Sequence, residues 1–299
     1  MESNNKNKGK NSKTSNSKRN IEQDNEKYYT NPKFIDISIG IIKKANIIKK
    51  NDMIIEPSAG NGAFINGIKT LSNKNNFYDI QPESPAITKQ DFLELDLSNI
   101  YDEEDDCHFI GNPPFGRQSS LAIKFIKKIC LFDKTKSVSF ILPKSFKKLT
   151  LQRSFPLNFH LEKEVNVPKN SFILNGKDID IPCVFQIWVK KEIERKIPIK
   201  QEPSGYSIEK KVNIDFDKDK YVLSFRRVGI SAGSIDHENL QDKSFQSHHF
   251  LKLNEKTIYK KLIKSKEKII KEFTHDNTVG PRSLSKQDII IVLNKYTLN

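Results

Sequence analysis

The four residues Asn112-Pro113-Pro114-Phe115 end an apolar, strand-like run at 108–112. Neither proline can donate a hydrogen bond to a neighbouring strand, so the strand has to stop here. Gly116 and Arg117 follow at once, one flexible residue and one charged residue. This order is typical either of a rigid turn or of the rim of an active site, where a stiff backbone presents polar atoms to a substrate.

A second stretch that could do chemistry is 53–64, MIIEPSAGNGAF, in which an apolar strand leads through two glycines into a helix. In such an arrangement backbone amides approach a nucleotide-like ligand at the carboxyl edge of a sheet. Gly60 and Gly62 form the turn, but the third glycine of the dinucleotide fingerprint and the Gly-Lys-Ser/Thr of a P-loop are missing. Because no lysine grips phosphates, the predicted ligand is a nucleoside without a pyrophosphate.

Two acidic residues follow at the ends of later predicted strands. Asp79 lies 23 residues after Glu56, close to the offset at which an acid meets ribose hydroxyls, although it could instead cap a turn. Asp91, followed by Phe92, lies at the edge of the third strand. There a carboxylate could accept from an exocyclic adenine amino group, but aspartate is also common at strand ends.

These motifs together resemble the S-adenosylmethionine-dependent methyltransferases that act on exocyclic amino groups, chiefly N6 of adenine. The resemblance rests on 56–64, EPSAGNGAF, followed later by Asn-Pro-Pro-Phe at 112–115, and it covers about residues 27–190. The segment KYYTNPKFID at 27–36 precedes the glycine turn, as in the gamma-type arrangement of adenine methyltransferases. The resemblance places Thr30 against the methionine carboxylate.

The resemblance implies S-adenosylmethionine as cofactor and assigns roles to two groups of residues. The implied cofactor-binding residues are Thr30, Glu56, Pro57, Gly60, Asn61, Gly62, Asp79, Ile80, Asp91 and Phe92. The implied catalytic residues are Asn112, Pro113, Pro114 and Phe115. The side-chain oxygen of Asn112 and the carbonyl of Pro113 would accept from the two amino hydrogens and free the nitrogen lone pair, while Phe115 stacks on the base.

The charge of the chain favours a polyanionic partner. The net charge is +14 and the pI is near 9.4, which is typical of nucleic-acid-binding proteins, although an A- and T-rich genome would also enrich lysine. We expect nucleic acid, with DNA and RNA both open. The candidate contacts are Arg117, Lys144, Phe172, Arg226, Arg227, Arg282 and Lys286. Phe172 could sandwich a flipped base or pack in the core, and the basic residues could simply be solvated.

The elements that must position these residues alternate between strand and helix. The predicted strands are 52–57, 75–80, 108–112, 137–142 and 183–189, and the predicted helices 32–45, 63–71 and 119–132. This pattern predicts β-α units around a mostly parallel sheet. The resemblance makes the fold class a Rossmann-like class I methyltransferase, α/β, with seven strands, an antiparallel last hairpin and a small C-terminal region.

The domain organisation follows from shifts in composition. Residues 1–26 are predicted to be a disordered basic tail, 27–190 the methyltransferase domain, and 191–220 a linker or excursion. The region 221–299 is a candidate target-recognition or substrate-binding region. Within it we expect a strand and turn at 221–235, a basic amphipathic helix at 254–273 and a helix or strand at 285–296.

Several classes of protein are disfavoured. No apolar stretch is long enough to span a bilayer, and the first residues lack the apolar core of a secretory signal, so we expect an intracellular protein, cytoplasmic or nuclear. Cys107, Cys130 and Cys183 lack metal-ligand or disulfide spacing, so no metal is predicted and the thiols should be free and buried.

Two other functions remain open. A protein glutamine methyltransferase could hold a planar amide in the same corner, although that group usually has Tyr where this chain has Phe115. An inactive nucleic-acid-binding protein of the same fold is the second alternative. It is disfavoured because Gly60, Gly62, Asp79 and Asn112 are all present.

Overall fold

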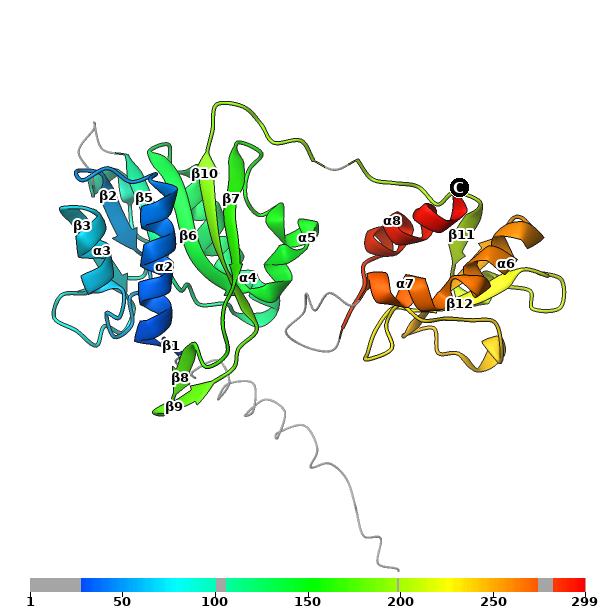
Figure 1. The fold of residues 1–299 in the computed structure, drawn as a ribbon. Helices are drawn as coiled ribbons and strands as arrows, with labels where there is room; N and C mark the ends of the chain where they lie inside the picture. Colours follow the sequence, from blue (N-terminus) through cyan, green and yellow to red (C-terminus); the bar gives the residue numbers. More distant parts are fainter. Residues whose placement is uncertain (1–27, 101–105, 198, 274–281, 299) are drawn as a thin grey trace, which may run out of the picture. The chain divides into compact units, whose positions relative to one another are not determined.

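A computed structural model describes residues 28–100, 106–197, 199–273 and 282–298, so the predicted tail at 1–26 lies outside the described residues. The chain divides into two units (Figure 1). The N-terminal unit consists of Met1–Pro143 and Arg153–Glu194, and the C-terminal unit of Lys144–Gln152 and Arg195–Asn299. The stretch 144–152 is therefore grouped with residues far away in the sequence.

The main sheet of the N-terminal unit has seven strands in the order β4-β3-β2-β5-β6-β10-β7. Their bounds are Thr88–Lys89 (β4), Lys74–Asp79 (β3), Met53–Glu56 (β2), Cys107–Gly111 (β5), Thr135–Pro143 (β6), Cys183–Lys190 (β10) and Phe159–Asn166 (β7). All neighbours are parallel except β10, which is antiparallel to both β6 and β7. This is the Rossmann-like class I methyltransferase fold, and the predicted fold class, with its antiparallel last hairpin, is confirmed.

Helices cover both faces of this sheet (Figure 1). Helices α2 (Pro32–Ala45) and α3 (Ile65–Leu71) lie on one face and α4 (Ser120–Leu131) on the other. Helix α2 begins where the Asn31 side chain accepts a hydrogen bond from the Lys33 amide and proline occupies the first turn, both common helix-start signals. Its apolar side chains join those of β2, β5 and β10 in one buried core.

A small three-stranded sheet lies beside the main one. Strand β1 (Tyr29–Thr30) pairs with β8 (Phe172–Leu174), which forms a hairpin with β9 (Lys177–Ile179). Thr30 is paired with Phe172 in this register. The hairpin therefore anchors the segment in front of α2, which carries a predicted cofactor-binding residue.

The C-terminal unit has its own antiparallel sheet, in the order β11-β14-β12-β13. The bounds are Tyr206–Glu209 (β11), Val222–Arg226 (β12), Ile235–Asp236 (β13) and His248–Leu253 (β14), with helices Lys256–Lys264 (α6), Lys266–Glu272 (α7) and Lys286–Thr297 (α8). Leu223 and Phe225 of β12 and Leu251 and Leu253 of β14 share one buried core with side chains of all three helices. Strand β11 lies in the stretch 191–220 that composition assigns to a linker or excursion.

The prediction of one helix at 254–273 is wrong. Two helices, α6 and α7, meet at Ser265, whose φ of −94° and ψ of 1° depart from helical values. Serine is a poor interior helix residue because its hydroxyl competes for backbone hydrogen bonds. Leu262 before the break and Ile269 after it are both fully buried in the same core.

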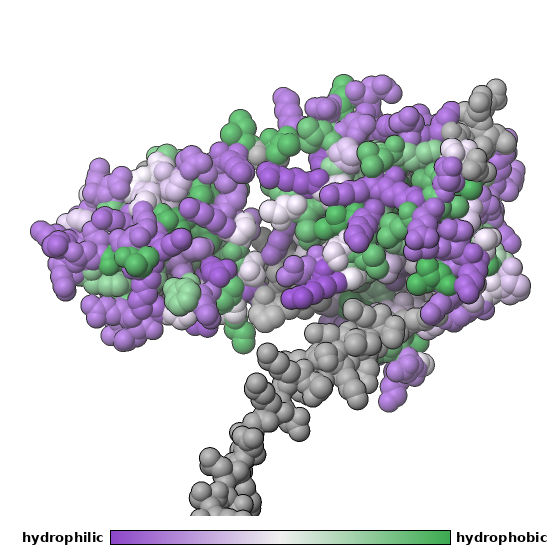
Figure 2. Space-filling view, turned by 180° about the vertical axis from the view of Figure 1, so that it is seen from behind, coloured by the Kyte–Doolittle hydropathy of each residue, from purple (hydrophilic) through white to green (hydrophobic). Residues whose placement is uncertain are grey.

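The surface view in Figure 2 is mostly hydrophilic, with hydrophobic side chains in small separate groups. Cys107, Cys130 and Cys183 are buried, as predicted. Within the described ranges, no helix combines the length and apolar character needed to cross a membrane.

Candidate cofactor and substrate site

The glycine turn follows β2 and is hydrogen-bonded to the end of β3. Gly60 and Gly62 have φ values of 54° and 82°, which glycine adopts without the steric cost that other residues meet. The Gly60 amide donates to Asp79 Oδ2 at 2.7 Å, and the Ala59 amide donates to the Tyr78 carbonyl at 2.9 Å. The turn that includes Pro57 and Asn61 is thereby fixed at the carboxyl edge of the parallel strands.

The two predicted acidic residues both cap turns. Asp79 accepts from the amides of Gly60 and Gln81, and Asp91 accepts from the Leu93 amide at 2.8 Å. The capping alternative is therefore realised for both. Each carboxylate oxygen still has a second lone pair for a further donor. Ile80, directly after Asp79, is 61% exposed and offers an apolar surface at the same edge.

Two predicted contact residues have side chains that cannot reach a ligand in this structure. Phe92 is 1% exposed, because its ring packs against Phe109 and Phe125 with centroids 6.0 and 5.2 Å away. Its ring is therefore part of the core, and the predicted cofactor contact of Phe92 stays a prediction that only its backbone could fulfil in this structure. Phe172 is also 1% exposed and belongs to the core under α2, which favours core packing over base stacking.

Residues 112–115, Asn-Pro-Pro-Phe, directly follow β5 and are called the Asn112 corner below. Asn112 Nδ2 donates to Thr30 Oγ1 at 3.3 Å, and Thr30 is itself 6% exposed. Asn112 Oδ1 is buried and has no hydrogen-bond partner among the described residues. Pro113 is buried, while Pro114 and Phe115 are half-buried, with Phe115 packed on the core. One end of the amide is thus anchored and the other is left as an unused acceptor.

Glu56 is the second unused acceptor. Its side chain is 2% exposed, and Oε2 has no hydrogen-bond partner among the described residues. Burial, with a smaller contribution from the charge of Asp79, raises the pKa of Glu56 well above its ordinary value. Gly111, with φ of 151°, leaves the room for this side chain, since a Cβ there would lie 3.2 Å from Glu56 Cγ. Two buried acceptors therefore occur at the ends of the neighbouring strands β2 and β5.

A contact that sequence reasoning missed links β1 to the glycine turn. The Tyr29 hydroxyl donates to Glu83 Oε1 at 2.7 Å, and this bond raises the pKa of Tyr29 to about 12. The Glu83 amide in turn donates to the Gly60 carbonyl at 3.1 Å. The only available signal was that Tyr29 precedes Thr30 in the segment 27–36; nothing local marked Glu83.

The predicted nucleic-acid contacts are divided between the units. Arg117 is exposed at the start of a 3-10 helix, Arg117–Ser119, directly after the Asn112 corner. Lys144 is half-buried and belongs to the C-terminal unit. The same unit contains Arg226, Arg227, Arg282 and Lys286. Arg117 is thus the one basic prediction that the structure places beside the Asn112 corner.

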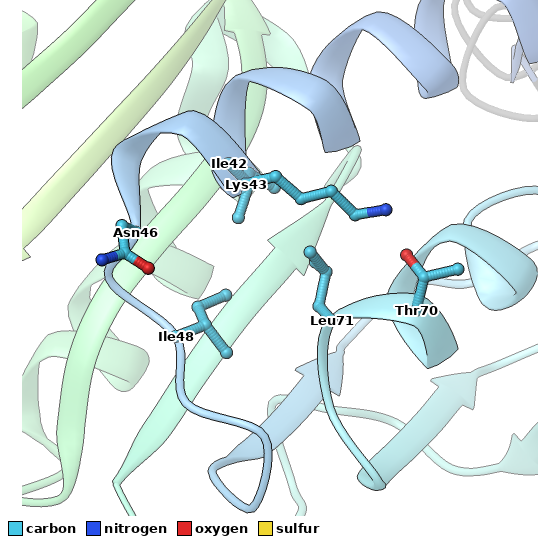
Figure 3. A pocket seen from close by; sticks show the side chains of 6 residues that line it. All are labelled: Ile42, Lys43, Asn46, Ile48, Thr70 and Leu71. Atoms are coloured by element: carbon cyan, nitrogen blue, oxygen red, sulfur yellow. The ribbon is translucent and has the colours of Figure 1, made fainter.

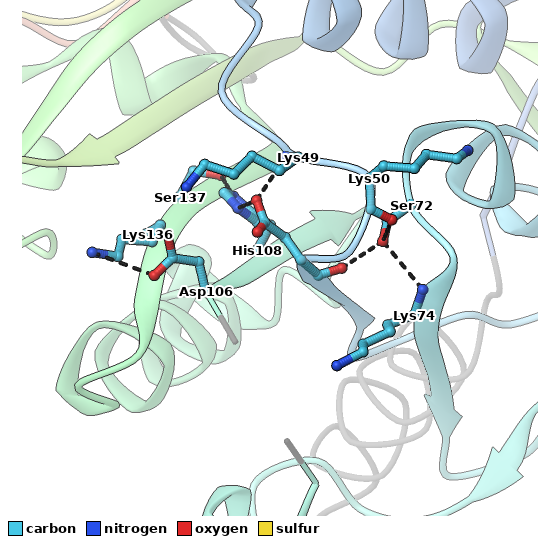
Figure 4. Close-up of polar contacts among 9 residues, drawn as sticks. Lys49, Lys50, Ser72, Lys74, Asp106, His108, Lys136 and Ser137 are labelled. Atoms are coloured by element: carbon cyan, nitrogen blue, oxygen red, sulfur yellow. Dashed lines mark hydrogen bonds and ion pairs between the residues drawn. The ribbon is translucent and has the colours of Figure 1, made fainter. Parts of the chain in front are cut away.

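A buried polar cluster occupies the opposite edge of the sheet, at the amino-terminal ends of β2, β5 and β6 (Figure 4). His108 Nδ1 lies 2.7 Å from Ser137 Oγ, and Nε2 lies 3.1 Å from Asp52 Oδ2. The order Ser, His, Asp resembles a hydrolase triad, but Ser137 is fully buried and no substrate can reach it. Burial lowers the pKa of His108, so this neutral imidazole links three strands.

An open pocket of about 270 Å³ lies between the carboxyl ends of α2 and α3 (Figure 3). It is lined by Ile42, Lys43, Asn46, Ile48, Thr70 and Leu71. None of these residues belongs to the predicted cofactor or substrate site.

Neither a family model nor a curated protein matches this chain. Similar solved structures include a modification subunit of a candidate type I restriction enzyme from Vibrio vulnificus, 13% identical with a TM-score of 0.42. That match covers 58% of this chain and 47% of the Vibrio chain, about half its length. A candidate RNA methyltransferase from Pyrococcus horikoshii is 17% identical over 56% of this chain and 89% of its own, with a TM-score of 0.44. A candidate class I S-adenosylmethionine-dependent methyltransferase from Listeria monocytogenes is 16% identical over 56% and 62%, with a TM-score of 0.42.

Proposed function

We propose that this chain transfers a methyl group from S-adenosylmethionine to the exocyclic N6 amino group of adenine in nucleic acid. The observation that carries the proposal is the buried, unpaired Oδ1 of Asn112, at the start of the Asn-Pro-Pro-Phe corner. A buried acceptor without a donor is costly, so its presence in a stiff corner beside the glycine turn favours a ligand that supplies the donor.

The residues of the carboxyl edge fit the cofactor. The unpaired Oε2 of Glu56 suits a cationic group, the turn at Gly60 and Gly62 leaves room for close approach, and Asp79 with exposed Ile80 suits a ribose and its base. Thr30, which accepts from Asn112, is assigned to the methionine carboxylate. When bound, S-adenosylmethionine supplies a methyl carbon made electrophilic by a positively charged sulfur.

The Asn112 corner solves the problem that an adenine amino nitrogen is a poor nucleophile. Its lone pair is delocalised into the ring. Asn112 Oδ1 and the Pro113 carbonyl accept from its two hydrogens and hold it pyramidal, which returns the lone pair to the nitrogen. With the cofactor bound, the freed lone pair would take the methyl group as its C–S bond breaks, and the nitrogen would then lose one proton to solvent because methylation acidifies it.

The remaining residues of the corner position the base. Phe115 is half-buried against the core, and its accessible part is assigned to stacking on adenine, worth about 1–3 kcal/mol. A base within a duplex has to leave the stack to reach this depth. Exposed Arg117 is assigned to a backbone phosphate, and the C-terminal region to target recognition.

The test compares methyl transfer from labelled S-adenosylmethionine into DNA, RNA and protein pools by wild type and Asn112→Ala. We expect label in adenine of one nucleic-acid pool and a loss in kcat of about 100- to 1,000-fold in the variant, the size expected when a transition-state hydrogen-bond partner is removed. Label in protein alone would instead support the glutamine methyltransferase. Oligonucleotide binding with no transfer to any pool would support the inactive binding protein.

A further inference from the structure

Three segments of the C-terminal unit meet at one end of the β12–β14 sheet. The Arg227 amide donates to the Ser247 carbonyl at 2.9 Å, which joins the end of β12 to the turn before β14. The Gly229 amide donates to the Arg282 carbonyl at 2.8 Å, and the Leu284 amide to the Arg227 carbonyl at 2.9 Å. These bonds fix the segments 226–233, 244–248 and 282–286 side by side.

The arginines of these segments are held in place by backbone carbonyls. Arg226 Nε donates to the Val228 carbonyl at 3.2 Å, an Arg227 terminal nitrogen donates to the Gln246 carbonyl at 2.7 Å, and Arg282 donates to the Ala232 carbonyl at 3.5 Å. Each contact uses one of the five N–H donors of a guanidinium. The remaining donors are thus pre-positioned, and they suit the geometry of a phosphate.

Two large apolar side chains project from turns among these arginines. Ile230 is 96% exposed and is the second residue of the turn 229–232. A hydrogen bond from the Ala232 amide to the Gly229 carbonyl closes this turn. Phe245 is 70% exposed and is the second residue of the turn 244–247. A hydrogen bond from the Ser247 amide to the Ser244 carbonyl closes this second turn. Single exposed apolar residues are common on proteins. Here, however, the local backbone hydrogen bonds tie both turns to the basic segments.

We propose that this end of the C-terminal unit, which we call the basic tip, binds single-stranded nucleic acid. The basic tip consists of Arg226, Arg227, Ile230, Phe245, Arg282 and Lys286. Its arginines and the exposed Lys286 contact phosphates, and Phe245 stacks on an unpaired base. The inference rests on the proposed function in one respect, because it names the substrate class from which the Asn112 corner would receive its adenine.

The combination of groups selects this partner. Basic groups alone suit any polyanion, but an exposed aromatic ring adds affinity for bases whose faces are free. Bases of an intact duplex are stacked on both faces and offer Phe245 no such surface. Two acidic groups near the tip are already engaged, since Asp236 pairs with Lys243 at 2.5 Å and Asp288 caps α8 through Ser285.

The experiment measures binding of the full chain to three labelled oligonucleotides by fluorescence anisotropy. They are a 12-nucleotide single-stranded DNA, a 12-nucleotide single-stranded RNA and a blunt duplex of the same length. Phe245→Ala is expected to weaken binding of a single strand by about 5- to 150-fold, the fold-change that corresponds to one base stack, and duplex binding much less. Phe245→Tyr should retain wild-type affinity because the ring is kept. Val212→Ala, at a side chain 84% exposed elsewhere in the same unit, is the matched control and should have no effect.

Arg227→Gln tests the phosphate contact separately. It should weaken binding of all strands and reduce the magnitude of the slope of log K against log salt by about 0.7 for single strands. Wild-type affinity in Phe245→Ala, or equal losses for single strands and duplex, would overturn the proposal. The proposal would also be overturned if the wild-type chain self-associates and Phe245→Ala abolishes this self-association without changing oligonucleotide binding. If Phe245→Ala loses single-strand binding and the wild-type chain transfers no methyl group, this inference is retained and the proposed function is rejected.

Discussion

Glu56 is a buried carboxyl group of the candidate site whose ionised form is disfavoured. The carboxyl is 2% exposed, its Oε2 has no partner among the described residues, and the facing acidic group is Asp79. Both burial and Asp79 favour the protonated form, so the pKa of Glu56 lies well above its ordinary value. A cationic ligand beside this group would favour the ionised form instead.

We therefore predict that binding of S-adenosylmethionine releases a proton from Glu56. Below the raised pKa, the free protein has to lose that proton before the ion pair forms, so affinity should increase with pH, by up to about tenfold per pH unit. Above the raised pKa the increase should stop. Titration calorimetry in buffers of different ionisation enthalpy measures the released proton directly.

The matched control for this linkage is Glu56→Gln, which keeps the shape but cannot titrate. It should bind S-adenosylmethionine more weakly and with no proton release. Cofactor binding by wild type with a flat pH profile and no released proton would contradict the role given to Glu56.

His108 makes the opposite edge of the sheet sensitive to acid. Its ring contacts Ser137 and Asp52, and it also feels the charges of Asp106, directly before its own strand β5, and of Lys136 on β6. Burial outweighs the two acidic groups and lowers the pKa of His108 below 6.5. As the pH falls below 6.5 the unfolded chain takes up a proton here and the folded chain does not, so stability declines.

The predicted loss is up to about 1.4 kcal/mol per pH unit, from pH 6.5 down to the folded pKa. Urea unfolding followed by the fluorescence of Trp188, the single tryptophan of the chain, reports the N-terminal unit alone. His108→Gln should be less stable than wild type at pH 7.5, and its stability should fall less between pH 6.5 and 5. A parallel decline in both proteins would show that other groups cause the acid sensitivity.

At the scale of elements, the connection from β5 to α4 is the least ordinary backbone of the N-terminal unit. Gly116, Gln118 and Ser119 have φ values of 66°, 53° and 64°, and for the last two this left-handed conformation is unfavourable. Such strain is common where a loop has a function, and this loop begins at the Asn112 corner. Its exposed residue Arg117 is the predicted phosphate contact.

Gly116→Ala should damage this connection. A Cβ at Gly116 would lie 2.9 Å from Leu121 Cβ and 3.1 Å from its backbone nitrogen, so α4 or the loop has to move. Gly176→Ala is the matched control, because Gly176 has φ of 75° but open space around it. The control should lose about 1–2 kcal/mol of stability from its backbone conformation alone, and Gly116→Ala should lose more.

Methyl transfer separates the two variants further. Gly116→Ala should lower kcat at a temperature where the protein is still folded, whereas Gly176→Ala should leave kcat near wild type. Equal stability and equal kcat in the two variants would contradict a special role for the loop.

The elements that sequence patterns predict well are those whose local signals agree. Helix α2 was predicted at 32–45 and has these bounds, because Asn31, Pro32 and the apolar stripe all favour the same start. Strand β7 was missed, since its residues 159–166 carry two glutamates, a lysine and a histidine and lie at the sheet edge. Its place is determined by pairing with β10, which is a tertiary contact.

In the candidate site, too, local signals could be predicted from the sequence and tertiary contacts could not. The strand ends at Glu56, Asp79 and Asn112 could be predicted because the carboxyl ends of parallel strands meet at one edge. Phe92 and Phe172 could not be judged from the sequence, since their burial depends on partners far away in the chain. The contact of Tyr29 with Glu83 is likewise formed across 54 residues.

At the scale of the whole molecule, the chemistry and the proposed nucleic-acid contacts are divided between two units with separate cores. The N-terminal unit has the class I fold and the unpaired acceptors of Glu56 and Asn112, and the C-terminal unit has the basic tip. The excess of basic residues is not uniform, because residues 51–110 hold 12 acidic and three basic side chains, and most of the net positive charge lies in the C-terminal unit.

The most direct test of the central claim is mass spectrometry of nucleosides from single-stranded DNA and RNA after incubation with S-adenosylmethionine and the full chain. Wild type should produce N6-methylated adenosine or deoxyadenosine. Asn112→Ala should produce at least about 100-fold less per unit time at saturating S-adenosylmethionine. Methylation at any other atom, or a wild-type rate in Asn112→Ala, would contradict the account.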